Sequence, residues 1–138
     1  IVQGWLPGTT LRERLRHSTT ADGRERFTRT VKIGPARARI EVEEDTDRET
    51  FDSLWPLTHA ARIRKRRHVV RHDDHRWEID VFLNRDLVVA EVELAHEFEI
   101  AVLPSWLAPY VVRDVTGDPA YFNAVMATAD HVAPAEHG

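Results

Sequence analysis

The sequence predicts an α+β domain that is dominated by antiparallel β-strands. Six stretches place charged or hydroxyl side chains at every second position, with mostly apolar residues between them. A period of two indicates a β-strand, in which residues i and i+2 point to the same face of the sheet. Short polar turns separate most of these stretches, which favours hairpins or a meander. The six are Arg12-x-Arg14-x-Arg16, Thr28-x-Thr30-x-Lys32, Arg39-x-Glu41-x-Glu43, Lys65-x-Arg67, Glu78-x-Asp80 and Glu91-x-Glu93.

The strands follow one another along most of the chain. Gly4, Pro7 and Gly8 are expected to break the first segment after the short apolar start Ile1-Val2. In the strands at 11–17, 27–33 and 37–44, residues that are mostly apolar on one face alternate with polar residues on the other. The later strands are expected at 11–17, 27–33, 37–44, 61–70, 77–82 and 87–94.

Two helices are expected among these strands. Thr46, followed three residues later by Glu49, is a capping-box signature. It predicts a helix with Phe51, Leu54 and Trp55 on one face, which ends at Pro56. A turn rich in apolar residues at 104–109 and a closing helix at 119–129 complete the prediction.

Composition restricts the class of protein. The chain has 138 residues, 42% hydrophobic and 30% charged, which is typical of one globular domain. Its net charge of −4 provides no general attraction to nucleic acid or to an acidic membrane. The sequence has no cysteine, which excludes disulfides and thiolate metal sites and is compatible with a reducing cytosol. No apolar run is long enough to span a membrane, and no signal peptide is recognised. A cytoplasmic protein without nucleic-acid or membrane partners is therefore expected.

The paired carboxylates are candidates for metal binding. Glu91 and Glu93 lie on one face of an apolar strand, where two like charges repel unless a cation or water lies between them. Carboxylate oxygens suit Mg²⁺ or Mn²⁺ rather than Zn²⁺. A solvated strand face is the alternative, and for one pair alone it is favoured. The additional pairs Glu41/Glu43 and Glu78/Asp80 favour a metal site.

The basic residues are candidates for phosphate binding, because guanidinium groups match phosphate oxygens. The alternative for Arg12, Arg14 and Arg16 is a charged face or edge that prevents aggregation. The run at 62–67 is compatible with a nucleic-acid patch, but the chain lacks the basic excess that usually accompanies one. If the basic and acidic faces converge, they form a cavity suited to a polyanion with a divalent metal.

Taken in order, these segments resemble the CYTH family, the triphosphate tunnel metalloenzymes. The resemblance extends from Gln3 to Met126. It rests on Gln3-Gly-Trp-Leu6, Leu11-Arg-Glu-Arg-Leu-Arg16, Thr30-Val-Lys32, Arg39-Ile-Glu-Val-Glu43, Phe51-x-x-Leu-Trp-Pro56, Arg64-Lys-Arg-Arg67, Trp77-Glu-Ile-Asp-Val-Phe82, Leu87-Val-Val-Ala-Glu-Val-Glu93, Val115-Thr116, Asp118 and Tyr121-x-Asn123. It implies an eight-stranded antiparallel β-barrel whose charged tunnel binds triphosphate compounds with Mg²⁺ or Mn²⁺. A single such domain is expected at 1–130, with a tail at 131–138.

The resemblance also implies roles for individual residues. Glu91 and Glu93 would bind metal, with Glu78 and Asp80 as further ligands. Glu41, Glu43 and Lys65 would be catalytic. The resemblance also permits other roles for four carboxylates, which could bind metal, position water or pair with basic residues: Glu41, Glu43, Glu78 and Asp80. The residues implied in phosphate binding are Arg12, Arg14, Lys32, Arg39, Lys65 and Arg67.

One family motif has no counterpart in the sequence. The family opens with a strand reading Glu-x-Glu-x-Lys, and none precedes Gln3, so the first strand is expected to be missing and the barrel to have a gap. Because an open edge recruits other strands, a homodimer through this edge is a further expectation.

The expected function is metal-dependent hydrolysis of inorganic triphosphate or a similar triphosphate compound. Inorganic triphosphate is favoured because the sequence indicates no apolar or aromatic pocket for a base. The alternatives are a class IV-type nucleotide cyclase and a non-catalytic polyphosphate-binding module.

Overall fold

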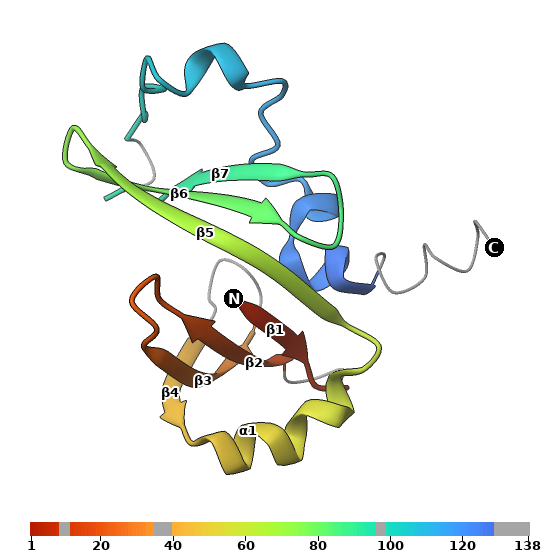
Figure 1. Cartoon of the computed structure of the whole chain (residues 1–138). Helices are drawn as coiled ribbons and strands as arrows, with labels where there is room; N and C mark the ends of the chain where they lie inside the picture. Colours follow the sequence, from red (N-terminus) through yellow and green to blue (C-terminus); the bar gives the residue numbers. More distant parts are fainter. Residues whose placement is uncertain (9–11, 35–39, 96–98, 129–138) are drawn as a thin grey trace. The chain divides into compact units, whose positions relative to one another are not determined.

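The computed structural model describes residues 1–8, 12–34, 40–95 and 99–128 (Figure 1). Within them, seven strands pair antiparallel in the order β4-β3-β2-β1-β5-β6-β7. The antiparallel α+β class is therefore confirmed, whereas seven strands rather than eight are found in the described ranges. The strands are β1 (Val2–Trp5), β2 (Arg12–Thr19), β3 (Glu25–Ile33), β4 (Ile40–Thr46), β5 (Arg62–His72), β6 (His75–Phe82) and β7 (Val88–Val92).

Contacts divide the chain into two compact units. Of the described residues, the first unit contains those of Ile1–Arg64 together with 120–128, and the second contains those of Lys65–Pro119. The first three residues of β5 pair with β1, and from Lys65 onward β5 pairs with β6. The single domain expected at 1–130 stays a prediction, and the tail expected at 131–138 lies outside the described residues. No helix in the part of the chain that the structure describes is long and apolar enough to cross a membrane.

The first unit begins with a strand, β1, where the sequence predicts a broken segment. β1 lies between β2 and β5, with Val2 opposite both His17 and Arg64. Gly4, which was expected to break the segment, is buried within this strand. A Cβ at Gly4 would lie 2.5 Å from Oγ1 of Thr58 and 3.0 Å from the Trp55 ring. Gly4 thus permits close packing of β1 against the turn at 55–58, since an interior glycine often marks close approach of another segment.

The helix between β4 and β5 begins one residue later than expected. α1 (Arg48–Leu54) is capped by Asp47, whose carboxylate accepts a 2.6 Å hydrogen bond from the Thr50 N–H. The predicted cap, Thr46, is instead the last residue of β4, where it pairs with Phe27. A carboxylate in the capping position serves as well as a hydroxyl, so the helix was predicted correctly and its first residue was not.

Pro56 does not end the helical path, although α1 itself ends at Leu54. A 3₁₀ helix, η1 (Trp55–Thr58), follows at once and carries Pro56 in its first turn. In the first turn of a helix, backbone N–H groups have no hydrogen-bond partner within the helix. Proline, which lacks an N–H, is therefore tolerated there. Two further 3₁₀ helices are η2 (Ala108–Tyr110) and η3 (Pro119–Tyr121). The expected closing helix occupies 123–128, and Ala129 lies outside the described residues.

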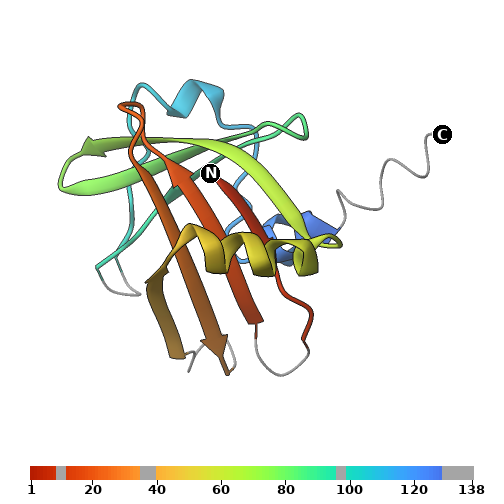
Figure 2. The ribbon, with the colours of Figure 1, turned by 60° about the horizontal axis from the view of Figure 1, so that its bottom comes forward.

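The core of the first unit lies between α1 and one face of its sheet. Figure 2 shows α1 crossing strands β1, β2 and β3 on that face. Leu15 is completely buried there. The ring of His17 stacks on Phe27 at 4.4 Å between centroids, and Phe51 of α1 stacks on Trp55 at 5.2 Å. Because these sheet residues are odd-numbered along β2 and β3, the even-numbered residues of both strands point to the opposite face.

The second unit is built on the β5–β6 hairpin. Asp73 and Asp74 form its turn with φ of 49° and 61°, and His72 pairs with His75. Two adjacent residues in the left-handed region are typical of a tight type I′ hairpin turn, where aspartate is tolerated. Trp77 and Phe82 of β6 are buried. β7 then pairs with β6 from Val88 to Val92.

Candidate functional site

The face of the first unit's sheet away from α1 carries three cross-strand rows of polar residues. In each row, an arginine of β2 lies opposite a residue of β3, which lies opposite a carboxylate residue of β4. Directly opposed residues of antiparallel strands share a face. We call this surface the charged face, and its rows are Arg12/Lys32/Glu41, Arg14/Thr30/Glu43 and Arg16/Thr28/Asp45.

The middle row is held by a hydroxyl group. Nη2 of Arg14 donates a 3.2 Å hydrogen bond to Oγ1 of Thr30, and that hydroxyl donates to Oε1 of Glu43, also at 3.2 Å. Arg14 and Glu43 themselves approach to 3.7 Å. Thr30 is completely buried, whereas the Glu43 side chain remains 40% exposed. A cation and a solvent-accessible carboxylate are therefore held next to each other at a defined position.

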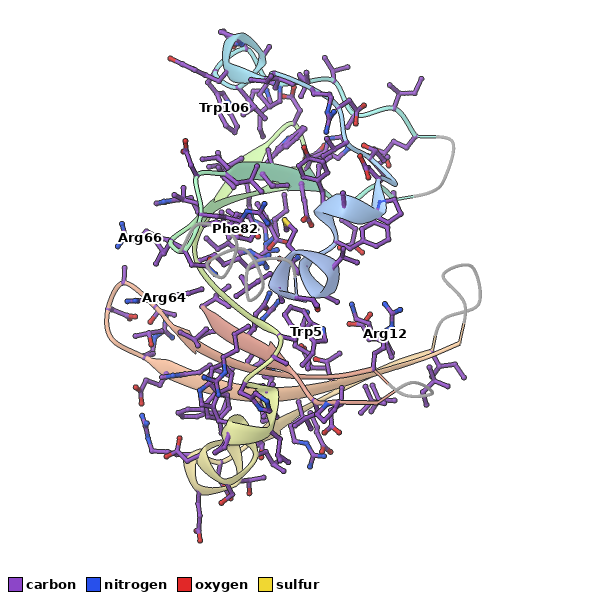
Figure 3. All side chains as sticks on the ribbon, turned by 90° about the vertical axis from the view of Figure 1, so that its right-hand side faces the viewer. Trp5, Arg12, Arg64, Arg66, Phe82 and Trp106 are labelled. Carbon is purple, nitrogen blue, oxygen red and sulfur yellow. The ribbon has the colours of Figure 1, made fainter. Side chains whose placement is uncertain are left out.

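The other rows extend this pattern. Nε of Arg16 donates a 2.9 Å hydrogen bond to Oε1 of Gln3, which is completely buried in β1. Arg12 and Glu41 are exposed, and Lys32 lies between them on β3. Figure 3 shows Trp5 and Arg12 on the side of the sheet away from α1. The predicted phosphate-binding residue Arg39 lies outside the described residues.

The second unit has its own ionic group, which we call the Asp80 cluster: Lys65, Arg67, Glu78 and Asp80. Nε and Nη2 of Arg67 donate to Oδ1 and Oδ2 of Asp80 at 2.7 and 2.8 Å. Nζ of Lys65 lies 2.7 Å from the same Oδ2. Arg67 also pairs with Glu78 through Nη1, and Arg76 pairs with Glu78 at 2.9 Å. Asp80 thus has a cation on each carboxylate oxygen.

These ion pairs shift two pKa values in the direction that favours charge. Burial alone would raise the pKa of Asp80, but the hydrogen bond from Arg67 and the charge of Lys65 outweigh burial and lower it. The hydrogen bond to Asp80 raises the pKa of Arg67 against the effect of burial. Asp80 and Arg67 are therefore both charged in the folded protein at neutral pH. Of the roles implied for Asp80, pairing with basic residues is the one that its contacts support.

The alternation of β5 divides its basic run into two sets. Lys65 is buried and Arg67 is half-buried in the Asp80 cluster, whereas Arg64 and Arg66 are exposed (Figure 3). The four consecutive basic residues at 64–67 therefore do not form one basic surface patch.

The predicted metal ligands are only partly brought together. Glu78 and Glu91 lie directly opposite each other in the β6–β7 pair and share a face. Glu93 lies beyond the last residue of β7, Val92. No group of three or more His, Asp or Glu side chains in the described ranges is arranged to bind a metal ion. The structure thus offers a carboxylate pair rather than a closed metal cage.

The first unit also contains an apolar cavity that the sequence did not indicate. Its volume is about 770 Å³, and Arg12 of the charged face lies on its wall. The cavity is formed where the end of β1, the turn after η1 and the helix at 123–128 meet. It is lined by Trp5, Leu6, Pro7, Gly8, Arg12, Leu57, His59, Ala60, Ala61, Ala124, Val125 and Thr128.

The predicted site residues therefore fall into two sets. Arg12, Arg14, Lys32, Glu41 and Glu43 share the charged face, and Lys65, Arg67, Glu78, Asp80 and Glu91 share one face of β5–β7. The expectation that both sets line one cavity stays a prediction. Sequence reasoning did not select Thr30 or Gln3 as site residues. The period-two position of Thr30 was visible, but its contact with both Arg14 and Glu43 required the strand register.

Comparison with known proteins gives three related results. The chain is 31% identical over 131 residues to an inorganic triphosphatase from Nitrosomonas europaea, covering 91% of this chain and 82% of that protein. It is 41% identical over 96 residues to an inorganic triphosphatase from Acetivibrio thermocellus, covering 68% of this chain but only 58% of that protein. A crystal structure of an inorganic triphosphatase matches with a TM-score of 0.58 and 26% identity, over 92% of this chain and 83% of that chain. No protein-family model matches the chain.

Proposed function

The chain belongs to the CYTH family of triphosphatases, and on this basis we propose that it hydrolyses inorganic triphosphate to diphosphate and orthophosphate. The observation that carries the proposal is the charged face. There, cationic side chains of β2 and β3 lie in register with carboxylates of β4. Phosphoryl transfer depends mainly on positioning and on neutralisation of phosphate charge, which such a face supplies.

The basic residues are assigned to the phosphate chain. Guanidinium groups hold two phosphate oxygens at once, and an ammonium group adds a compact charge. Arg12, Arg14 and Lys32 would bind phosphate oxygens on the charged face. Lys65 and Arg67 would contribute positive charge, with Asp80 fixing both side chains through the contacts that already hold them.

The carboxylates of β4 are assigned to the attacking water. In hydrolysis, the water oxygen forms a bond to the terminal phosphorus while the bond from that phosphorus to the bridging oxygen breaks. A carboxylate within hydrogen-bonding reach accepts the proton of the water. Glu43 suits this role because it is exposed and has its position set by Thr30 and Arg14. Glu41, two residues earlier on the same face, would help to orient the water.

A divalent metal fits the carboxylates of the second unit. Mg²⁺ is commonly bound by one or two carboxylates together with substrate phosphates and water, rather than by a cage of protein ligands. Glu78 and Glu91 provide two opposed carboxylates, and Glu93 follows on the chain. We assign these three residues to Mg²⁺ or Mn²⁺. When bound, the ion would withdraw charge from phosphate oxygens as a Lewis acid.

The test is phosphate release from triphosphate by the purified chain, with Mg²⁺ or Mn²⁺, in wild type and in Arg14→Gln. We expect turnover in wild type and a loss on the order of 100-fold in the variant, comparable to removal of one charge-stabilising donor. The matched control is Arg29→Gln, because Arg29 lies on the other face of the sheet and pairs with Glu13. Equal activity of wild type and Arg14→Gln would contradict the assignment.

The same experiment separates the two alternatives. A nucleotide cyclase would form a cyclic nucleotide and diphosphate from ATP, which chromatography detects. A polyphosphate-binding module would bind triphosphate without releasing orthophosphate. ATP is a useful substrate to include because the cavity beside Arg12 offers apolar surface next to the charged face.

A further inference from the structure

The position of Thr30 suits a small hydroxyl side chain better than a long or an apolar one. It stands between Arg14 and Glu43 in the middle row of the charged face. The Cα atoms of the outer residues of such a row are two strand spacings apart, which is about 10 Å. A long side chain at the centre would separate Arg14 from Glu43, and an apolar one would leave both without the polar contact. A small hydroxyl residue permits both side chains to extend over it and contacts both.

The hydroxyl of Thr30 uses both of its hydrogen-bonding functions in this row. It accepts from Nη2 of Arg14 at 3.2 Å and donates to Oε1 of Glu43 at 3.2 Å. The direct distance between Arg14 and Glu43, 3.7 Å, is longer than a good hydrogen bond. The hydroxyl is therefore the shortest polar connection between the cation and the carboxylate.

The environment of Thr30 makes this connection rigid. Thr30 is completely buried in β3, and β-branched side chains have few rotamers in a strand. Arg14, by contrast, has four rotatable side-chain bonds, and Glu43 is partly exposed. The stiff residue thus limits the movement of the two flexible ones.

We propose that Thr30 is a positioning residue for triphosphate hydrolysis, which holds the phosphate-binding Arg14 and the water-orienting Glu43 in their working arrangement. This inference rests on the proposed function, because it assigns those tasks to Arg14 and Glu43. Displacement of reacting groups by about 1 Å can lower a rate on the order of 100-fold, so a residue that does not touch the substrate can still control turnover.

The test compares three variants of the full chain. Thr30→Val keeps the shape of the side chain and removes the hydroxyl, and Thr30→Ser keeps the hydroxyl and removes a methyl group. The matched control is Thr28→Val. Thr28 is on the same face of β3 and is 4% exposed, and within the described residues its hydroxyl has no side-chain hydrogen bond. Both valine variants exchange the hydroxyl of a buried threonine for a methyl group in the same strand.

We expect kcat for triphosphate to fall by roughly tenfold to 100-fold in Thr30→Val, within the range for displaced reacting groups. Activity in Thr30→Ser and Thr28→Val should stay within a few-fold of wild type. Thermal midpoints measured in parallel separate loss of turnover from loss of folded protein, because assays run well below every midpoint compare only folded variants. Unchanged kcat in Thr30→Val, or an equal loss in Thr28→Val, would overturn the proposal.

A binding measurement distinguishes this inference from the proposed function. Titration calorimetry with inorganic triphosphate reports the affinity without turnover. If wild type binds triphosphate and releases no phosphate, the proposed hydrolase function fails. The role of Thr30 in holding Arg14 then predicts weaker binding in Thr30→Val than in Thr28→Val, and equal affinities would refute that role. If wild type neither binds nor hydrolyses triphosphate, both inferences fail.

Discussion

The ammonium group of Lys65 lies 2.7 Å from Oδ2 of Asp80, and the two side chains are 0% and 3% exposed. Arg67 binds both oxygens of the same carboxylate. A buried ion pair of this kind stabilises a fold only while it is complete, because removal of one partner leaves a buried charge without compensation.

Substitution of Asp80 should therefore destabilise the protein strongly. In Asp80→Asn, Lys65 and Arg67 lose their shared negative partner, and we expect the free energy of unfolding to fall by about 3–5 kcal/mol. Urea denaturation followed by tryptophan fluorescence measures this change. The control is Asp86→Asn, at an exposed position of the same unit, which should change stability by less than about 0.5 kcal/mol. A loss in Asp80→Asn as small as that of the control would contradict the structural role.

The lowered pKa of Asp80 predicts a loss of stability in acid. Its pKa in the folded protein lies below the ordinary aspartate value of 3.8, because the hydrogen bond from Arg67 and the charge of Lys65 outweigh burial. The ionised form is therefore favoured by folding, and this contribution is complete above the unfolded pKa. It is lost as pH falls from about 4 through the lower, folded pKa. Stability measured against pH should fall more steeply in wild type than in Asp80→Asn over this window, and parallel curves would count against the assignment.

Removal of Glu91 should affect metal use and leave the fold intact. We expect EDTA to stop triphosphate turnover and added Mg²⁺ or Mn²⁺ to restore it. In Glu91→Gln, the metal concentration for half-maximal activity should rise by roughly tenfold or more, since even residues that support ligands alter metal affinity by that factor. Glu44→Gln is the control, because Glu44 lies opposite Arg29 on the other face of β4. Full turnover in excess EDTA would exclude the metal role.

The stability of Glu91→Gln provides an independent check on the strand register. Glu91 lies directly opposite Glu78, and like charges in that arrangement destabilise a strand pair. Its neutralisation in the absence of metal should leave stability unchanged or raise it by about 0.2–1 kcal/mol. A clear decrease in the urea midpoint of the metal-free variant would show that Glu91 makes a stabilising contact instead.

A methyl group at Gly4 should be poorly tolerated. In Gly4→Ala, the new Cβ would meet Thr58 and the Trp55 ring at distances that require backbone movement. We expect a loss of about 1–3 kcal/mol, which is typical of overpacking. Gly23→Ala is an informative comparison, because Gly23 has a φ of 88° but nothing within 4 Å of the added carbon. Its cost should arise from backbone strain alone, about 1–2 kcal/mol. Thermal unfolding of both variants checks the difference, and a Gly4→Ala variant as stable as wild type would contradict the packing of η1 against β1.

Local pattern in the sequence was sufficient to determine which residues share a face. The period of two in β2, β3 and β4 predicted correctly that Arg12 and Arg14 share one face of their strand, as do Glu41 and Glu43 of β4. Periodicity is a local property, since the backbone of any strand turns side chains to opposite faces. The α+β class and the helix at 48–54 were predicted for the same reason.

Only the tertiary structure determined which charged and polar side chains contact one another. Arg14 and Thr30 are 16 residues apart, and Thr30 and Glu43 are 13 apart, so their contacts depend on strand pairing and register. The same holds for Asp80, whose neighbours Lys65 and Arg67 come from another strand. β1 was missed because Gly4 weakens the local strand pattern, while its pairing with β2 and β5 stabilises it. Side-chain direction follows from the backbone of each residue, whereas partners follow from long-range hydrogen bonds, and for that reason the faces were predictable and the contacts were not.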